Sequence, residues 1–179
     1  MASVENHRIT DELLVARIVR GEKKMLDVLF DRYIERLMRY VVLFVKSQEE
    51  AKDITQDILV KIFKALGSYR SSGRFESWFF TIARRTLIDC YRKKKLKTFS
   101  FDSQEIEEPV AQPQEGSGKA PELLQGLPAR DREILQLRFL ESLSYEEIAE
   151  ITGMAPGTLR NVVCRSLKRL QEDNPDELS

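Results

Sequence analysis

The middle of the chain limits most strongly what it can fold into, because a polar stretch there separates two helical sequences. Over residues 98–125 the helical pattern stops, and residues that interrupt helices recur: Pro109, Pro113, Gly116, Gly118 and Pro121. Between Phe101 and Gly118 the chain carries five acidic residues and no basic one. Such a stretch cannot bury enough apolar surface to fold by itself. We therefore predict a flexible acidic linker over these residues.

The linker divides the 179-residue chain into two parts, each of which has the sequence pattern of a small helical domain. Apolar residues recur at helical spacing from residue 11 to 97 and again from 127 to 170, without sustained strand-like alternation. We predict an all-α protein in four parts: a helical domain over 1–97, the linker over 98–125, a second helical domain over 126–172 and a tail over 173–179.

Local signals mark the helix ends in the first domain. Ser47 followed by Glu50 resembles a capping box, and the apolar stripe of the helix that it begins ends at Gly67. The next helix is predicted to begin near residues 74–76, after a short polar loop over 68–73.

The second domain contains a helix-turn-helix pattern. Ser144 and Glu147 form a second capping box at the start of a short helix, and Gly153 supplies a tight turn. Pro156 suits the first turn of the following helix, because its missing N–H would have no partner within the helix. Two short helices joined by a tight turn are typical of DNA-binding proteins.

The last helix of this pattern has one basic face. Four apolar residues are predicted to face inward: Leu159, Val163, Leu167 and Leu170. The opposite face gathers residues at spacings of three and four: Gly157, Arg160, Asn161, Cys164, Arg165 and Lys168. Arginine can pair bidentately with guanine and asparagine with adenine, while lysine and arginine anchor phosphates. We interpret this face as a surface that reads the DNA major groove, the alternative being an ordinary solvated helix face.

A second basic feature follows an aromatic segment in the first domain. Seven positive charges stand against Asp89 alone within fourteen residues: Arg84, Arg85, Arg92, Lys93, Lys94, Lys95 and Lys97. This density of positive charge is typical of a phosphate-binding surface. Phe75, Trp78 and Phe79 precede it directly, and aromatic surfaces beside basic ones suit unstacked single strands. By spacing alone these aromatic residues are more often part of a core, because Trp78 and Ile82 share a helical face.

A third feature is acidic. Asp53, Gln56 and Asp57 share one face of the first capped helix, turned away from its apolar stripe. Considered alone, such a face is usually only solvated.

Composition excludes several classes of function. The 29 basic residues are cancelled by 29 acidic ones, so a nucleic-acid site has to be local. His7 is the only histidine, and Cys90 and Cys164 lie far apart, which leaves no metal-ligand set or catalytic triad. We expect no catalytic residue, metal, cofactor or small-molecule substrate. Nothing resembles a signal peptide or a membrane span, so we expect a cytoplasmic protein with reduced cysteines that is not itself a membrane protein.

In their order and spacing, the three features resemble the sigma-70 family of bacterial RNA polymerase initiation factors, in its short extracytoplasmic-function (ECF) group. Residues 50–58, EAKDITQDI, are similar to the family's acidic D-A-E-D-L-V-Q-E-V stretch, and residues 75–92 are similar to the segment that follows it. Residues 157–170 resemble the family's closing S-E-G-T-V-x-S-R-x-x-R-A helix. The resemblance implies sigma region 2 in the first domain and sigma region 4 in the second.

The resemblance also implies partners and roles. Asp53, Gln56 and Asp57 would dock on the beta-prime clamp of core RNA polymerase, and the factor would also contact the beta flap. A group of residues around the 68–74 loop would bind and melt the promoter's minus-ten element: Ser68, Tyr69, Arg70, Arg74, Phe75, Trp78, Phe79, Arg84, Arg85, Arg92 and Lys93. The last helix would read the minus-thirty-five element through Pro156, Thr158, Arg160, Asn161, Arg165 and Lys168. ECF factors are typically held inactive by an anti-sigma factor.

Two other classes of function stay open from the residues alone. A conventional helix-turn-helix regulator would bind palindromic duplex DNA without polymerase. A nucleic-acid enzyme would need clustered carboxylates or a metal near the basic helix, and Asp89 alone supplies neither.

Overall fold

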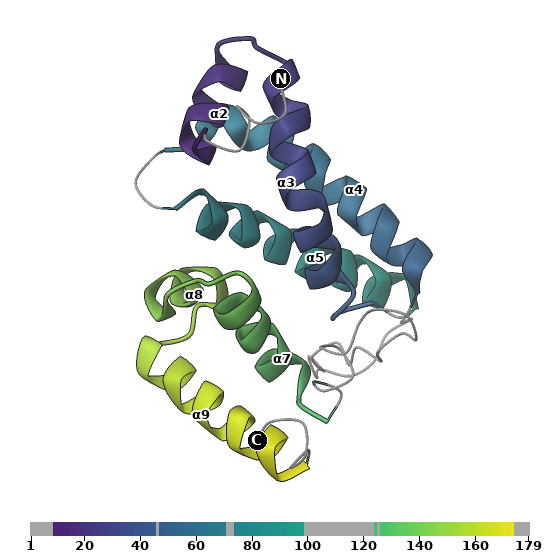
Figure 1. Ribbon diagram of the computed structural model, residues 1–179. Helices are drawn as coiled ribbons and strands as arrows, with labels where there is room; N and C mark the ends of the chain where they lie inside the picture. Colours follow the sequence, from purple (N-terminus) through teal and green to yellow (C-terminus); the bar gives the residue numbers. More distant parts are fainter. Residues whose placement is uncertain (1–8, 46, 71–73, 99–123, 125, 174–179) are drawn as a thin grey trace.

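The computed structural model of the protein describes residues 9–45, 47–70, 74–98, 124 and 126–173. Within these residues every regular element is helical, which confirms the predicted all-α class. The helices are α2 (Asp11–Val19), α3 (Lys24–Val41), α4 (Gln48–Ala65), η1 (Leu66–Ser68), α5 (Phe75–Thr98), α7 (Ala129–Leu135), η2 (Gln136–Leu140), α8 (Tyr145–Thr152) and α9 (Pro156–Asp173). They form two groups, α2 to α5 and α7 to α9 (Figure 1). Nearly all of the predicted linker lies outside the described residues.

The Ser47 cap that the sequence indicated in the first group is present through one bond of the predicted capping box. The Ser47 hydroxyl accepts a hydrogen bond from the Glu50 N–H at the start of α4, at 3.1 Å. The helix ends two residues before Gly67 and continues into the single turn of η1. α5 begins at Phe75, within the predicted interval.

Aromatic rings fill the core of the first group. The largest of its fully buried side chains include Tyr33, Tyr40, Phe75, Phe79 and Phe80. Tyr33 of α3 contacts two phenylalanines of α5, with its ring centroid 5.4 Å from that of Phe75 and 4.5 Å from that of Phe79. Such contacts add to the large apolar area that each ring buries. They fix α5 against α3, while Ile58 and Ile62 of α4 complete the core.

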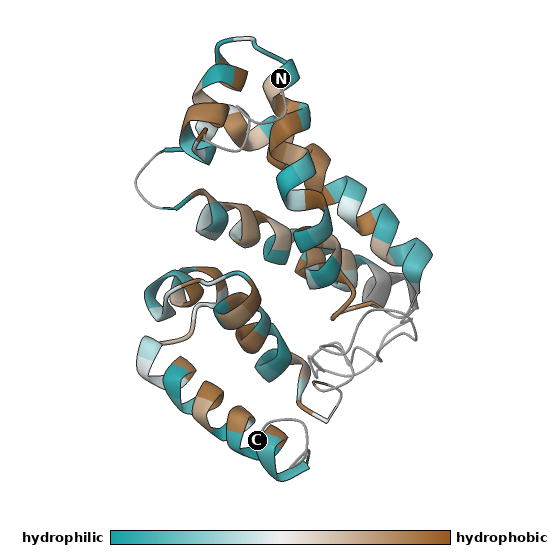
Figure 2. Cartoon of the chain, viewed as in Figure 1, coloured by the Kyte–Doolittle hydropathy of each residue, from teal (hydrophilic) through white to brown (hydrophobic). Residues whose placement is uncertain are grey.

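The second group is a helix-turn-helix in the predicted register. Both bonds of the Ser144–Glu147 capping box are present at the start of α8. Gly153 has φ +75°, a left-handed conformation that glycine adopts without steric cost and that ends the helix. α9 begins at Pro156, and its hydrophobic residues face α7 and α8 while its hydrophilic residues face outward (Figure 2).

One prediction about α9 is wrong. Leu167 is 43% exposed, and the neighbouring Ser166 is buried in its place. The Ser166 hydroxyl donates to the buried Asp131 carboxylate of α7 at 3.3 Å, so a polar contact occupies the inward position. Helical spacing identifies the inward side of a helix but not which of its edge positions a neighbouring helix covers.

The two groups contact each other, a relation that the sequence leaves open. α5 packs against α4 on one side and against α8 on the other.

No helix in the described part of the chain is both long and apolar enough to cross a membrane.

Candidate nucleic-acid and protein-binding surfaces

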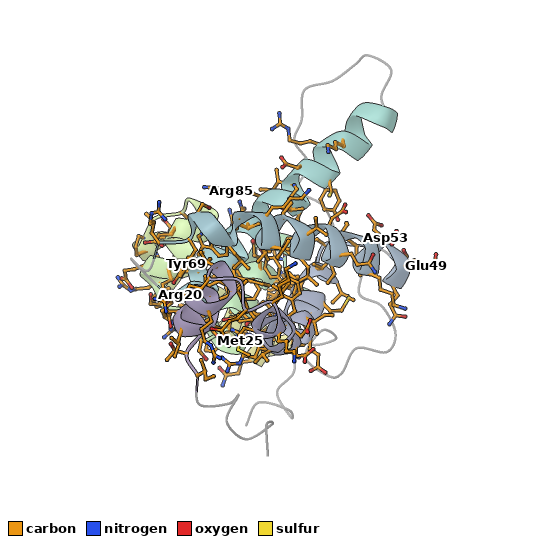
Figure 3. All side chains as sticks on the ribbon, turned by 90° about the horizontal axis from the view of Figure 1, so that it is seen from above. Arg20, Met25, Glu49, Asp53, Tyr69 and Arg85 are labelled. Carbon is orange, nitrogen blue, oxygen red and sulfur yellow. The ribbon has the colours of Figure 1, made fainter. Side chains whose placement is uncertain are left out.

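The acidic face of α4 is exposed as predicted from its spacing. Asp53, Gln56 and Asp57 point to solvent, whereas Ile54 and Ile58 point into the core. Figure 3 shows Asp53 beside Glu49 near one end of α4, well away from Tyr69 and Arg85. The acidic group therefore forms a surface separate from the aromatic and basic residues.

Sequence reasoning missed an apolar continuation of this surface. Val60 and Phe63, one and two turns along α4 from Gln56, are each 50% exposed. Exposed large apolar side chains next to charged ones are typical of protein-binding surfaces. Their exposure could have been predicted from helical spacing, because neither residue falls on the inward stripe of Ile54, Ile58 and Ile62.

The loop before α5 presents small and basic residues beside an aromatic pair. Ser68 and Arg70 are exposed, and residues 71–73 of the predicted loop lie outside the described residues. Tyr69 is half-buried, and its ring centroid lies 5.2 Å from that of Trp78, which is also half-buried. These two aromatic side chains keep part of their surface accessible.

The prediction that Phe75 and Phe79 contact DNA is not supported by their positions. Both side chains are fully buried in the core, where Phe75 lies 5.4 Å from Tyr69 and from Trp78, centroid to centroid. A buried ring cannot stack on an extruded base. Phe75 instead packs against the half-buried rings of Tyr69 and Trp78 from the core side. Burial of its own ring in the core fixes its position.

The basic residues of α5, together with Arg74 just before it, fall into two sets by what they contact. Arg85, Arg92 and Lys93 are exposed, and Arg85 is labelled on the outer side of α5 in Figure 3. The side chains of Lys94, Lys95 and Lys97 lie outside the described residues. The first set thus gives α5 an open basic surface.

Arg84 and Arg74 belong to the second set, because both contact the other helical group. Arg84 Nε lies 2.9 Å from the Glu133 Oε1 of α7. Arg74 Nη1 donates to the Ser142 carbonyl at 3.1 Å, and its Nε lies 3.7 Å from Glu147. Two predicted DNA contacts are therefore engaged within the protein.

Two buried carboxylates, which the sequence analysis did not identify, organise this junction. The Tyr40 hydroxyl donates to Glu133 Oε1 at 2.6 Å, so this oxygen binds Tyr40 and Arg84 together. Burial, reinforced by the Glu133 charge, raises the pKa of Tyr40 well above its usual value, so the hydroxyl stays protonated and donates. Arg36 Nε lies 2.6 Å from Glu141 Oε2. Periodicity gave no signal for Glu133, because it shares its helical face with the polar residues Arg130 and Gln136.

The basic face of α9 lies on the surface. Thr158, Arg160, Asn161, Arg165 and Lys168 are exposed, and Pro156 at the start of the helix is half-buried. The opposite side packs Leu159, Val162 and Val163 into the core. Gly157 and Cys164 also lie on the outer face, as the spacing predicts. One helix thus holds the set of donors that can position on and read a major groove.

The described part of the chain places no three histidine, cysteine or acidic side chains together as metal ligands. Burial raises the pKa of the half-buried Cys90, and the nearby Asp57 charge adds to this, so its reactive thiolate form is disfavoured.

Two family models match the chain, sigma-70 region 2 over residues 29–97 and sigma-70 region 4 over residues 118–170. The chain is 37% identical over 131 residues to the RNA polymerase sigma factor SigV of Bacillus subtilis, covering 72% of this chain and 78% of the relative. It is 29% identical over 178 residues to the RNA polymerase sigma-H factor of Pseudomonas aeruginosa, covering 90% and 92%.

Solved structures show the same arrangement of helices. CnrH in complex with the cytosolic domain of CnrY matches with a TM-score of 0.66 at 20% identity, over 93% of this chain and 98% of that one. RpoE in complex with the anti-sigma factor NepR, from Bartonella quintana, matches with a TM-score of 0.64 at 25% identity, over 83% and 95%. With both sigma regions matched and ECF factors among its relatives, the chain belongs to the sigma-70 family of RNA polymerase sigma factors, in the extracytoplasmic-function group.

Proposed function

We propose that this factor binds core RNA polymerase through the acidic face of α4 and reads a two-part promoter through α5 and α9. The observation that carries the proposal is the separation of an exposed acidic surface on α4 from an exposed basic face on α9, which lies in the other helical group (Figure 1). A specificity subunit needs both kinds of surface, one for protein and one for DNA. It acts in the cytoplasm, without catalytic residues, cofactor or small-molecule substrate of its own.

The polymerase contact is assigned to Asp53, Gln56 and Asp57, which would dock on the beta-prime clamp. Their exposure, and the neighbouring apolar Val60 and Phe63, support this assignment. The surface combines charges for orientation with apolar area for affinity. The second domain would dock on the beta flap.

The minus-ten contact is assigned to the 68–74 loop and the accessible residues of α5. Tyr69 and Trp78 offer partly exposed rings on which an extruded base could stack, and Ser68, Arg70 and Arg85 are exposed around them. Arg92 and Lys93 would bind the backbone further along the helix. Arg74 and Arg84 can join this surface once they leave their contacts with the second domain.

The minus-thirty-five contact is assigned to α9. Its outer residues are Pro156, Thr158, Arg160, Asn161, Arg165 and Lys168. We place the polymerase and minus-ten domain over residues 1–97, the linker over 98–125, the minus-thirty-five domain over 126–172 and the tail over 173–179. The linker would run through the polymerase channels, where its acidity resembles that of nucleic acid.

We also propose control by an anti-sigma factor. The solved structure of RpoE from Bartonella quintana contains the anti-sigma factor NepR, and this chain resembles it over nearly the whole of that protein. An inhibitor of this factor would cover the same polymerase- and DNA-binding faces.

Transcription with purified components tests the proposed function. The protein and core polymerase from the same organism should give transcripts on genomic templates that begin at fixed sites and are absent with core polymerase alone. The Asp53→Lys/Asp57→Lys double variant should lose at least about ten-fold in polymerase affinity, since it reverses two charges at one surface. Asp31→Lys, a charge reversal at an exposed site on α3, is the matched control. Absence of specific transcripts with the unaltered protein would reject the proposal.

Arg165 of α9 should contribute to base preference at the minus-thirty-five element. Arg165→Ala should weaken promoter binding about 5- to 150-fold, because a bidentate base contact provides about 1–3 kcal/mol of discrimination. Arg169→Ala is the control, since Arg169 is exposed at the edge of the same helix and pairs with Asp173 at 3.7 Å. Gel shifts on promoters altered one base pair at a time measure the affinity and the base preference of both variants. An equal loss with Arg165→Ala and Arg169→Ala would indicate phosphate binding alone.

A further inference from the structure

A cluster of one aromatic and two basic side chains connects three elements of the helix-turn-helix. Tyr145 is the first residue of α8. The guanidinium carbon of Arg138, from η2, lies 4.9 Å from the centroid of its ring, and that of Arg160, from α9, lies 5.3 Å from it. Both distances are within the range of cation–π contacts.

The two arginines are held differently. Arg138 is half-buried, and its Nη1 donates to the Leu143 carbonyl at 2.8 Å, which fixes it to the turn before α8. Arg160 is mostly exposed, and its guanidinium also forms an exposed ion pair with Glu146 at 3.4 Å. Exposed ion pairs of this kind restrain a side chain weakly.

The ring between them is itself fixed. Tyr145 is half-buried and packs against the hydrophobic core, and Arg138 contacts it from η2. The Arg160 guanidinium therefore packs on an aromatic ring whose position is fixed by other contacts. A long, flexible arginine loses conformational freedom when it binds a base edge, and holding it beforehand reduces that loss.

We propose that Tyr145 is a positioning residue of the DNA-reading surface, whose ring holds the Arg160 guanidinium in place to contact a base. The inference rests on the proposed function, because it concerns how α9 reads the minus-thirty-five element. It assigns a role in specificity to a residue that does not lie on α9.

Two substitutions separate the ring face from the rest of the side chain. Tyr145→Phe keeps the aromatic face and removes the hydroxyl. Tyr145→Leu keeps an apolar side chain but removes the π-face. Only the second should alter how Arg160 is held.

The test measures base preference with the holoenzyme, formed from the full-length protein and core polymerase. Binding is compared on promoters in which each minus-thirty-five base pair is changed in turn, for the unaltered protein, Tyr145→Phe, Tyr145→Leu, Arg160→Ala and the Tyr145→Leu/Arg160→Ala double variant. We expect Tyr145→Leu to lose about two- to five-fold in discrimination, only at the base pair whose preference Arg160→Ala removes. Tyr145→Phe should match the unaltered protein, and the double variant should match Arg160→Ala.

Three results would overturn the inference. These are an equal loss at every base pair with Tyr145→Leu, an additive loss in the double variant, or an Arg160→Ala variant with unchanged base preference. Thermal unfolding of each variant checks its fold, and Arg138→Met, which removes the contact on the ring from η2, should give a smaller loss at the same base pair. If the unaltered holoenzyme itself has no promoter preference, the proposed function fails first, which distinguishes the two failures.

Discussion

The Glu133→Ala substitution is expected to separate the two helical groups in the free protein. Glu133 is buried, and one of its oxygens accepts hydrogen bonds from Tyr40 at 2.6 Å and from Arg84 at 2.9 Å. Hydrogen bonds to a charged group contribute about 1.5–3 kcal/mol each, and the substitution removes the two that Glu133 accepts and leaves the 28% exposed Arg84 without its partner. Interfaces between domains of one chain are usually small and polar, so a loss of this size should open the junction.

Small-angle X-ray scattering measures this opening as an increase in the radius of gyration. The matched control is Glu172→Ala, which removes an exposed glutamate 3.8 Å from Lys168 on α9 and should leave the scattering unchanged. Tyr40→Phe removes one hydrogen bond and keeps the ion pair, so it should open the junction less. Unchanged scattering with Glu133→Ala would show that other contacts hold the two groups together.

Opening should also change DNA binding by the free protein. Arg74 and Arg84 contact the second domain in the structure and are assigned to the minus-ten element when they are released. The Glu133→Ala variant should therefore bind a single-stranded minus-ten oligonucleotide more tightly than the unaltered protein. Arg84→Ala cannot test this, because it removes the contact with Glu133 and the proposed DNA contact together.

The Phe79→Ala substitution should cost about 3–5 kcal/mol in the free energy of unfolding, since it removes a fully buried ring and leaves a cavity. Phe79 lies 4.5 Å from Tyr33 and 5.5 Å from Phe80, ring centroid to centroid, at the centre of the first domain. Urea denaturation measures the loss.

Trp78→Ala is the informative comparison because Trp78 directly precedes Phe79 on α5 but is only half-buried. It should destabilise the domain less and should reduce promoter melting, if its accessible ring receives a base as proposed. Wild-type stability in the Phe79→Ala variant would contradict the assignment of Phe79 to the core.

The features that depend on neighbouring residues were predictable from the sequence. Ser144 and Glu147 complete their cap within one turn, and Gly153 adopts a left-handed φ that few other residues tolerate. Pro156 can begin a helix because the N–H that proline lacks would have no partner within the first turn. The exposed faces of α4 and α9 followed from helical spacing in the same way.

The features that depend on distant residues were not predictable from periodicity. Phe75 and Trp78 follow each other within one turn of α5, yet only Phe75 is fully buried, because α3 places Tyr33 against it. Likewise, Leu167 is exposed and Ser166 buried because Asp131 of α7 offers the serine a hydrogen-bond partner. Which residue becomes buried is decided by the element that packs against it.

The sequence by itself determined that the chain is two helical units with a basic helix-turn-helix and an acidic face, and that its zero net charge is a sum of segregated parts. The tertiary structure alone decided which charges are paired across the junction between the two groups. Arg84 and Arg85 are adjacent and chemically identical, yet Arg85 faces solvent while Arg84 pairs with Glu133, 49 residues further along the chain. Local propensity depends on a few neighbouring residues, whereas the pairing of a buried charge depends on what the whole fold brings beside it.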